Sequence, residues 1–320
     1  MTARFPLGDA EIRLAMIGMV EGNGHPYSWS AIFNGYDAPA MAACPYPVIP
    51  VYLGREPRES FGIPGARVTH IWTDRPEDAP RVAAASLIPN VLDRPEDAIG
   101  RVDAVLVATD IGGEHVARVR PFIEAGVPAF VDKPLCDSED DLRMFIRWAG
   151  EGKAFLSSSC MRYAKEFLPF RESTRNLGHL RLATITTPKS WERYGIHALE
   201  GVYPILGPGF LAARHSGDAK RNVVHFRHAS GADVVAAAID DLVGAFGVLG
   251  LFGTAGHAEA AFGDTFYAFK KQLEAYVAFL RTGRPPFPFA ETVELMKMIV
   301  AGLRSREAGG REVTLDEIRT

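Results

Sequence analysis

Cysteine is scarce in this sequence, and basic charge does not dominate it. The 320 residues include only three cysteines, Cys44, Cys136 and Cys160, which are widely spaced and form no C-x-x-C pair. We therefore expect neither a disulfide framework nor a zinc site, and interpret the cysteines as free thiols in a reducing cytoplasm. The formal net charge of −4 argues against nucleic acid or an anionic membrane as a partner, because both favour basic surfaces.

Long apolar runs are also missing. The first apolar stretch, Ile12 to Val20, is too short to span a bilayer. The residues before it lack the apolar core of a signal peptide, so we expect no membrane span and a cytoplasmic location. The histidines form no H-x-x-x-H or H-E-x-x-H pattern, and we predict no metal.

The first half of the chain contains a regular alternation of strand and helix patterns. Apolar runs predict strands at 12–17, 66–74, 103–110, 128–131 and 154–159, with helices between most of them. This alternation predicts an α/β fold with a doubly wound parallel sheet, the Rossmann arrangement. Residues 37–65 are rich in proline and glycine, and we expect an irregular insertion there.

The second half follows a different pattern. Strands are predicted at 180–187, 223–228, 234–239 and 248–252, and helices at 265–280 and 291–305. Most of these strands follow one another without long helices, which predicts an α+β domain with a large, mostly antiparallel open sheet. We assign residues 1–135 to a dinucleotide-binding domain, 136–160 to a linking helix and strand, and 161–320 to a domain for substrate binding and oligomerisation.

The tripeptide Asp132-Lys133-Pro134 is the strongest local feature. It follows the strand predicted at 128–131, and the carboxyl ends of strands are where open α/β sheets gather ligands. Partial burial beside a nicotinamide would lower the pKa of Lys133 and suit it to proton transfer. The alternative is a solvated lysine in a loop.

The glycine-containing turn after the first strand is a weaker signal. Gly18, Gly22, Asn23 and Gly24 precede a helix predicted to begin near His25, but they do not match G-x-G-x-x-G. The turn could hold a pyrophosphate or be an ordinary strand-to-helix connection.

The acid at the end of the second predicted strand bears on the type of cofactor. Asp74 fits the position that receives ribose hydroxyls and so favours NAD, although it could instead cap the next helix. Arg75 beside it leaves NADP possible.

Five segments in order resemble the glucose–fructose oxidoreductase / inositol dehydrogenase / MocA (Gfo/Idh/MocA) family. The segments are Val105–Asp110 with His115, Ala125–Leu135, Ser159–Tyr163, Gly195–Glu200 with Leu206-Gly207, and Phe279–Pro285 with the helix at Glu291. The resemblance implies a Rossmann domain that binds NAD or NADP and a sheet domain that forms the substrate cleft. It also implies that Lys133 and His197 flank the hydroxyl that loses its hydride.

The residues and the resemblance together define a candidate site. The candidate cofactor-binding residues are Gly18, Gly22, Asn23, Gly24, His25, Asp74, Arg75, Thr109, Asp110, His115, Asp132 and Lys133. The candidate substrate-binding residues are Arg162, Tyr163, Trp191, Arg193, Tyr194 and Glu200. The expected partner is a small sugar or polyol, and an open apolar sheet face predicts a homodimer or homotetramer.

One position departs from the family pattern. Many members carry an aspartate four residues before the histidine, where this chain has Arg193. Glu192, Tyr194 or Glu200 could take over the role of that acid, or Arg193 could bind a negatively charged substrate. Three functions follow: an NAD(P)-dependent sugar or polyol dehydrogenase, a hydrolase or lyase that recycles its cofactor, and a non-enzymatic NAD-binding sensor or subunit.

Overall fold

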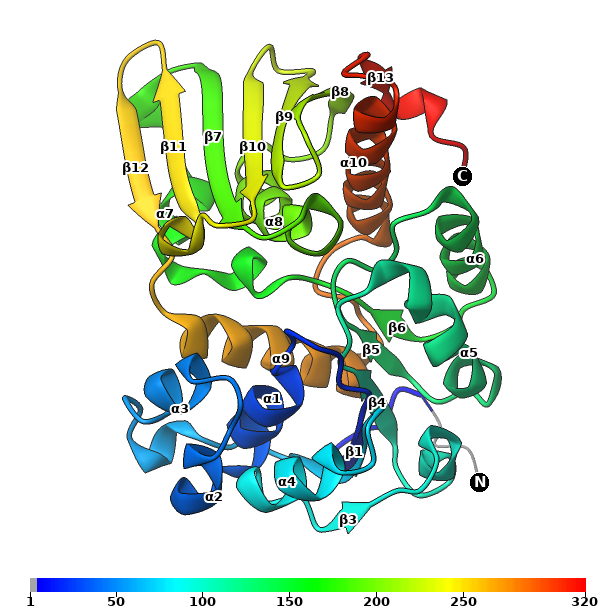
Figure 1. The fold of residues 1–320 in the computed structure, drawn as a ribbon. Helices are drawn as coiled ribbons and strands as arrows, with labels where there is room; N and C mark the ends of the chain where they lie inside the picture. Colours follow the sequence, from blue (N-terminus) through cyan, green and yellow to red (C-terminus); the bar gives the residue numbers. More distant parts are fainter. Residues whose placement is uncertain (1–4) are drawn as a thin grey trace.

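The first sheet is parallel and has six strands in the order β3-β2-β1-β4-β5-β6 (Figure 1). The computed structural model describes residues 5–320. The strands are β1 (Ile12–Ile17), β2 (Ala66–Trp72), β3 (Asn90–Val91), β4 (Ala104–Val107), β5 (Ala129–Val131) and β6 (Phe155–Leu156). Every residue of β4 and β5 is buried, as expected for strands covered on both faces. The predicted Rossmann fold is confirmed.

The strand order reverses between β1 and β4. From β1 the chain moves through β2 to one edge of the sheet, and from β4 it moves through β5 to the other. The loops that leave β1 and β4 therefore diverge at the carboxyl ends of these strands, the switch point where open α/β sheets place a ligand crevice. The connecting helices are α1 (His25–Asn34), α4 (Asp78–Ala85), α5 (His115–Glu124) and α6 (Glu139–Gly150).

The insertion at 37–65 is more ordered than its composition indicated. It contains α2 (Ala38–Ala42), α3 (Val48–Leu53) and a turn of 3-10 helix at Arg58–Ser60. The Asp37 carboxylate accepts a hydrogen bond from the Ala40 amide and caps α2. Ile49 and Leu53 are buried. The expectation of an irregular segment was wrong because local caps and burial organise short helices there.

The second sheet has seven strands in the order β12-β11-β7-β10-β9-β8-β13, and α8 (Ile196–Leu206) contacts β7 and β10. Its strands are β7 (Leu180–Pro188), β8 (Phe210–Gly217), β9 (Arg221–His228), β10 (Asp233–Ile239), β11 (Val248–Gly253), β12 (His257–Ala261) and β13 (Val313–Thr314). Neighbouring strands are antiparallel except β7 and β10. The predicted mostly antiparallel sheet is confirmed, although its strands β8, β12 and β13 were not predicted. The strand β3 of the first sheet was not predicted either.

Two helices complete the chain. The helix α10 (Phe289–Glu307) contacts β8 and α6, whereas α9 (Thr265–Thr282) lies beside α1 in the lower half of Figure 1. Leu273 and Tyr276 of α9 share a core with Leu14 and Leu106, and the Tyr276 hydroxyl donates to the carbonyl of Val105 over 3.0 Å. Helix α9 therefore packs with the first sheet, although it lies within residues 161–320, which we assigned to the second domain from the sequence.

Two features are absent from residues 5–320, the part of the chain that the structure describes. Within that range, no helix combines the length and apolar character needed to cross a membrane. In the same range, no three or more His, Cys, Asp or Glu side chains are grouped so as to hold a metal ion. Residues 1–4, the start of the segment used for the signal-peptide prediction, lie outside the described range.

Candidate active site

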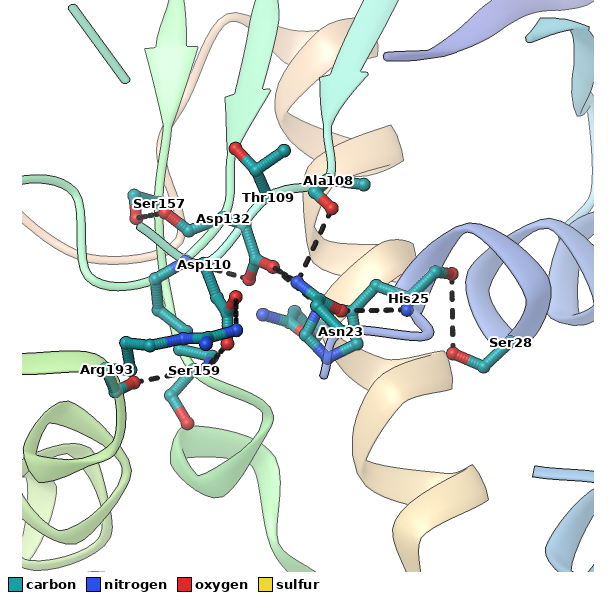
Figure 2. A network of polar contacts seen from close by, with 12 residues as sticks. Asn23, His25, Ser28, Ala108, Thr109, Asp110, Asp132, Ser157, Ser159 and Arg193 are labelled. Carbon is teal, nitrogen blue, oxygen red and sulfur yellow. Dashed lines mark hydrogen bonds and ion pairs between the residues drawn. The ribbon is translucent and has the colours of Figure 1, made fainter. Parts of the chain in front are cut away.

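The crevice at the carboxyl ends of β1, β4 and β5 gathers polar side chains from loops far apart in the sequence. Figure 2 shows Asn23 and His25 from the β1–α1 loop pointing toward Asp132, and Arg193 of the second domain pointing toward Asp110. The strands β1, β4, β5 and β6 are parallel, so their carboxyl ends lie at the same edge of the sheet. The doubly wound topology alone therefore brings these loops together.

The Asp132 carboxylate is fully buried and holds the β1–α1 loop in place. It accepts a hydrogen bond from the Asn23 amide nitrogen over 3.1 Å and lies 2.6 Å from Nδ1 of His25. The Asn23 amide also donates to the carbonyl of Ala108 over 3.4 Å. The ring of His25 stacks on Trp29 with centroids 4.4 Å apart. Asp132 thus positions the side chains of Asn23 and His25.

Lys133 is buried but charged. Its side chain is 3% exposed, and Nζ lies 3.5 Å from Oδ2 of Asp110 and 3.2 Å from the Arg193 carbonyl. It also lies 4.5 Å from the centre of the Tyr194 ring, in the geometry of a cation–π contact. Burial is the largest single influence and lowers the pKa of Lys133, but Asp110, Tyr194 and Asp132 together outweigh it and the net pKa is raised. The expectation of a lowered pKa was wrong because the sequence did not reveal these partners.

Asp110 is the charge that organises this part of the site. Burial alone raises its pKa, but Lys133 and Arg193 hold the pKa at about 2. Arg193 Nη2 donates to Asp110 Oδ1, and also to the Glu21 carbonyl over 3.0 Å. One buried carboxylate therefore links two cations, one from each domain.

His197 lies on α8 and is uncharged. Its Nδ1 is 2.7 Å from the Ser159 hydroxyl oxygen, and its ring lies 4.8 Å from the Tyr194 ring and 5.1 Å from that of Phe246. Burial, and secondarily the nearby charge of Lys133, lower the pKa of His197 well below its ordinary value. Tyr194 thus contacts both Lys133 and His197, which brings the two predicted catalytic residues to one place.

Arg162 and Glu200 pair with each other instead of lining a cleft. Arg162 Nε bonds Glu200, and its Nη1 donates to Glu291 over 2.8 Å. Glu200 also accepts the Ser159 amide over 3.0 Å, and burial raises its pKa despite the opposing effect of Arg162. Both residues are buried. They stabilise the junction between η4 (Cys160–Tyr163), α8 and α10.

Two further predicted substrate residues lie in or near the core. The Trp191 side chain is fully buried, and its indole nitrogen donates to the Ile299 carbonyl over 3.1 Å. The Tyr163 hydroxyl is buried, and burial raises the Tyr163 pKa to about 12. The structure assigns Trp191 to packing; the sequence could not show this because its partners come from α10.

The glycine turn is closed by its own side chains. Gly18 has φ +88, and a Cβ there would lie 2.7 Å from a methyl carbon of Thr109. The amide of His25 donates to the Asn23 side chain over 2.9 Å. The amides of Tyr27 and Ser28 donate to the carbonyl of Gly24, and Pro26 has no amide proton. At the start of α1, therefore, only the amide of Gly24, the N-cap residue, has no acceptor among residues 5–320.

Asp74 lies beside the same turn. Its carboxylate accepts the Met19 amide over 2.9 Å and pairs with Arg118 at 2.7 Å. Arg75 is exposed and pairs with Glu77, away from the crevice. Asp74 does not cap α4, whose N-cap residue is Glu77.

His115 and Thr109 connect the loops behind the site. The ring nitrogens of His115 lie 2.6 Å from the Thr109 carbonyl and 3.2 Å from that of Leu135. The ring is fully buried, so it braces the loops. The Thr109 hydroxyl is also buried and has no hydrogen-bond partner among residues 5–320.

Three residues of the site were not predicted from the sequence. Ser159 orients His197, Arg118 pairs with Asp74, and Lys189 donates to the Tyr194 hydroxyl over 2.7 Å and to the Gly22 carbonyl over 3.3 Å. Lys189 has φ +64, a left-handed conformation that few side chains adopt. A lysine after Pro188 carries no sequence signal of such a conformation.

Fold and site define a two-domain α/β protein with a dinucleotide-type crevice. Residues 49–158 match the model of the GFO_IDH_MocA family, an oxidoreductase family with an NAD-binding Rossmann fold. The matched segment includes the predicted Lys133 motif and begins after the glycine turn. This match confirms the resemblance inferred from the sequence motifs over residues 49–158.

Solved structures share the fold over nearly the whole chain. Scyllo-inositol dehydrogenase from Lactobacillus casei has 12% identity and a TM-score of 0.75, and covers 97% of this chain and 99% of its own. Myo-inositol dehydrogenase from Corynebacterium glutamicum has 17% identity and a TM-score of 0.70, with 95% and 98% covered. GenD2 from gentamicin A biosynthesis, in complex with NAD, has 18% identity and a TM-score of 0.71, with 95% and 96% covered. No curated protein matches the chain by sequence.

The crevice has features that fit a dinucleotide. Gly18 and Gly22 both have positive φ, which glycine adopts without strain. Because glycine has no Cβ, a ligand can approach the backbone closely at these two turns. The Asp74 carboxylate is 29% exposed beside Gly18 and can accept ribose hydroxyls. Thr109 offers a buried, unpartnered hydroxyl on the β4 side.

Proposed function

We propose that the protein is an NAD(P)-dependent oxidoreductase that transfers a hydride between nicotinamide and a hydroxyl-bearing carbon of a sugar, cyclic polyol or sugar acid. The observation that supports it most is the buried, charged Lys133 held by Asp110 beside an uncharged His197. This pair lies at the switch point of the sheet, where ligands of open α/β sheets bind.

Lys133 and His197 divide the work on the substrate hydroxyl. When bound, the cofactor supplies a hydride acceptor. In the tautomer that carries its proton on Nδ1 and donates it to Ser159, His197 has Nε2 free to accept the hydroxyl proton. The ammonium group of Lys133 then stabilises the oxygen as negative charge develops, because it is already charged and desolvated. Asp110 keeps Lys133 protonated and positioned.

Asp74 favours NAD over NADP. Its carboxylate would repel a 2′-phosphate, whereas ribose hydroxyls can donate to it. Arg118 already pairs with Asp74, and Arg75 pairs with Glu77, so neither arginine is free for a phosphate.

The test is turnover with a panel of sugars, polyols and sugar acids in the presence of NAD+ or NADP+, followed by the absorbance of the reduced nicotinamide. We expect reduction by at least one compound, and its loss in Lys133→Ala but not in Lys220→Ala, an exposed lysine of the β8–β9 turn. Product formation without net reduction of NAD+ would indicate a cofactor-recycling hydrolase or lyase. Tight NAD+ binding without turnover of any compound would indicate a sensor or subunit.

Self-association belongs to the same proposal. The outer face of the second sheet carries half-buried apolar residues such as Val223 and Val235, and association into a dimer or tetramer would cover them. Light scattering of the purified chain checks this, and a monomer at micromolar concentration contradicts it.

A further inference from the structure

The start of α1 offers few free amides to a diphosphate. Rossmann domains usually bind a diphosphate through such amides at the start of the helix. Here the first-turn amides of α1 are used internally, by the Asn23 side chain and the Gly24 carbonyl. The remaining candidates are the amides of Val20, Glu21, Gly22 and Gly24, which donate to no other residue in the described range.

Two cations of the second domain lie against this same segment. Lys189 Nζ donates to the carbonyl of Gly22 over 3.3 Å, and Arg193 Nη2 donates to that of Glu21 over 3.0 Å. A Cβ built on Gly22 would lie 3.7 Å from Arg193 Nη2. Both cations thus lie next to the amides that remain free.

The charge of Lys189 is not neutralised by the protein. Arg193 shares the Asp110 carboxylate with Lys133. Lys189, by contrast, forms no ion pair with any residue from 5 to 320, and its partners are a carbonyl, the Tyr194 hydroxyl and the face of that ring. The Glu21 carboxylate is on an exposed residue of the loop.

The backbone of Lys189 indicates that its position is maintained against strain. Only Leu87 and Lys189 among the described non-glycine residues have positive φ, and that of Lys189 is +64. Such strain persists where surrounding structure enforces it, and it concentrates at functional sites. The strained residue sits between β7 and η7 (Trp191–Gly195) and its side chain reaches the loop of the other domain.

We propose that Lys189, assisted by Arg193, binds the diphosphate of the dinucleotide and supplies the positive charge that the start of α1 does not. This rests on the proposed function. It makes cofactor binding depend on a residue of the second domain, so that the diphosphate bridges the two domains. The family match begins at residue 49, after this loop, which agrees with a different mode of phosphate binding.

The experiment measures the affinities of NAD+, ADP and adenosine for the full chain by calorimetry. In Lys189→Asn, which removes the charge but tolerates positive φ, Kd for NAD+ and ADP should rise about 10- to 100-fold, the usual effect of losing one charged hydrogen bond. Adenosine, which has no phosphate, should bind as to wild type. Lys189→Arg should restore most of the affinity, and Lys220→Asn, an equal charge change at a distant exposed site, should change nothing.

Two results would overturn the proposal. Unchanged NAD+ and ADP affinities in Lys189→Asn would remove Lys189 from diphosphate binding. A selective rise in KM for an acidic substrate would assign the cation to the substrate instead. Failure of the wild-type chain to bind NAD+ or ADP would overturn both this proposal and the proposed function, whereas wild-type binding with unaffected variants overturns this one alone.

Discussion

The crevice has two ends that differ in how their charges are held. The lysine end comprises Asp110, Asp132, Lys133 and His197, all at most 4% exposed and each within contact of another polar group. The loop end comprises Glu21, Gly22 and Asp74, which are exposed, together with Lys189. The two domains meet there through single hydrogen bonds to backbone carbonyls.

This difference assigns separate tasks to the two ends. At the lysine end, burial and fixed partners set each protonation state, which suits chemistry on a hydroxyl. At the loop end, water competes for every contact, so each contact contributes less to stability and can be exchanged for a ligand. Substitutions at the lysine end should therefore change rate and folding, and those at the loop end should change cofactor affinity.

The largest expected effect is on turnover. Lys133→Ala should lower kcat on the order of 10³- to 10⁴-fold, because it removes the charged group at the reacting oxygen. The Kd for NAD+ should stay within about threefold, since the diphosphate lies at the other end. Steady-state kinetics and calorimetry measure the two quantities. An equal loss of kcat and of NAD+ affinity would contradict the assignment of chemistry and cofactor binding to different ends of the crevice.

The second effect is on folding. Asp110→Asn should lower the free energy of unfolding by about 3 to 5 kcal/mol at pH 7, because Lys133 and Arg193 lose their buried carboxylate. The pKa of Asp110 is depressed to about 2. Its contribution is therefore complete above about pH 4, the ordinary value, and is lost as the pH falls toward 2. Urea unfolding at pH 7 and pH 3 checks this: the gap between wild type and variant should narrow at pH 3.

The third effect is on how the free energy of unfolding changes with pH. The pKa of His197 is lowered well below 6.5 by burial, so the unfolded chain binds this proton first as the pH falls. Wild type should lose about 1.4 kcal/mol of stability per pH unit below 6.5 through this group. His197→Asn should lack that part of the slope. Unfolding free energies from pH 7 to pH 5 measure it, and identical slopes would mean that His197 is charged in the folded protein.

The smallest effect belongs to the loop end. Asp74→Asn should raise the Kd for NAD+ about tenfold, because a charged acceptor of ribose hydroxyls is lost. The Kd for NADP+ should fall, since the carboxylate that repels a 2′-phosphate is removed while Arg118, still paired with Glu114, keeps its positive charge beside the site. Asp218→Asn, in the exposed β8–β9 turn, is the matched control. An unchanged ratio of the two affinities would separate Asp74 from cofactor selection.

Parts of this picture were predictable because they depend on local patterns. The apolar runs of β1 and β4 and the period of α9 are visible in the sequence, and the motif at Lys133 follows directly from β5. The short strands β3 and β13 have two residues each, too few for a period to emerge. The edge strand β12 alternates alanine with polar residues, a pattern without a strong apolar signal.

The site itself was predicted in part, since the sequence could nominate residues but not pair them. Lys133, Asp110, Tyr194 and His197 were named, and the structure brings them together. Trp191 and Arg162 were named for the substrate, but they are buried against partners on α10. Residue type and motif order do not reveal which side of a helix faces the core once two domains meet.

By itself, then, the sequence determined the two sheets, their strand types and the lysine at the carboxyl end of β5, because periodicity and short motifs are local properties. Only the tertiary structure decided that Asp110 keeps Lys133 charged, and that Asn23 closes the first turn of α1. It alone placed Lys189 of the second domain against the first. The contacts of Lys133 and Lys189 join residues 23 to 167 positions apart, and Asn23 is held by Asp132, 109 positions along the chain; burial and topology decide such contacts and no local pattern encodes them.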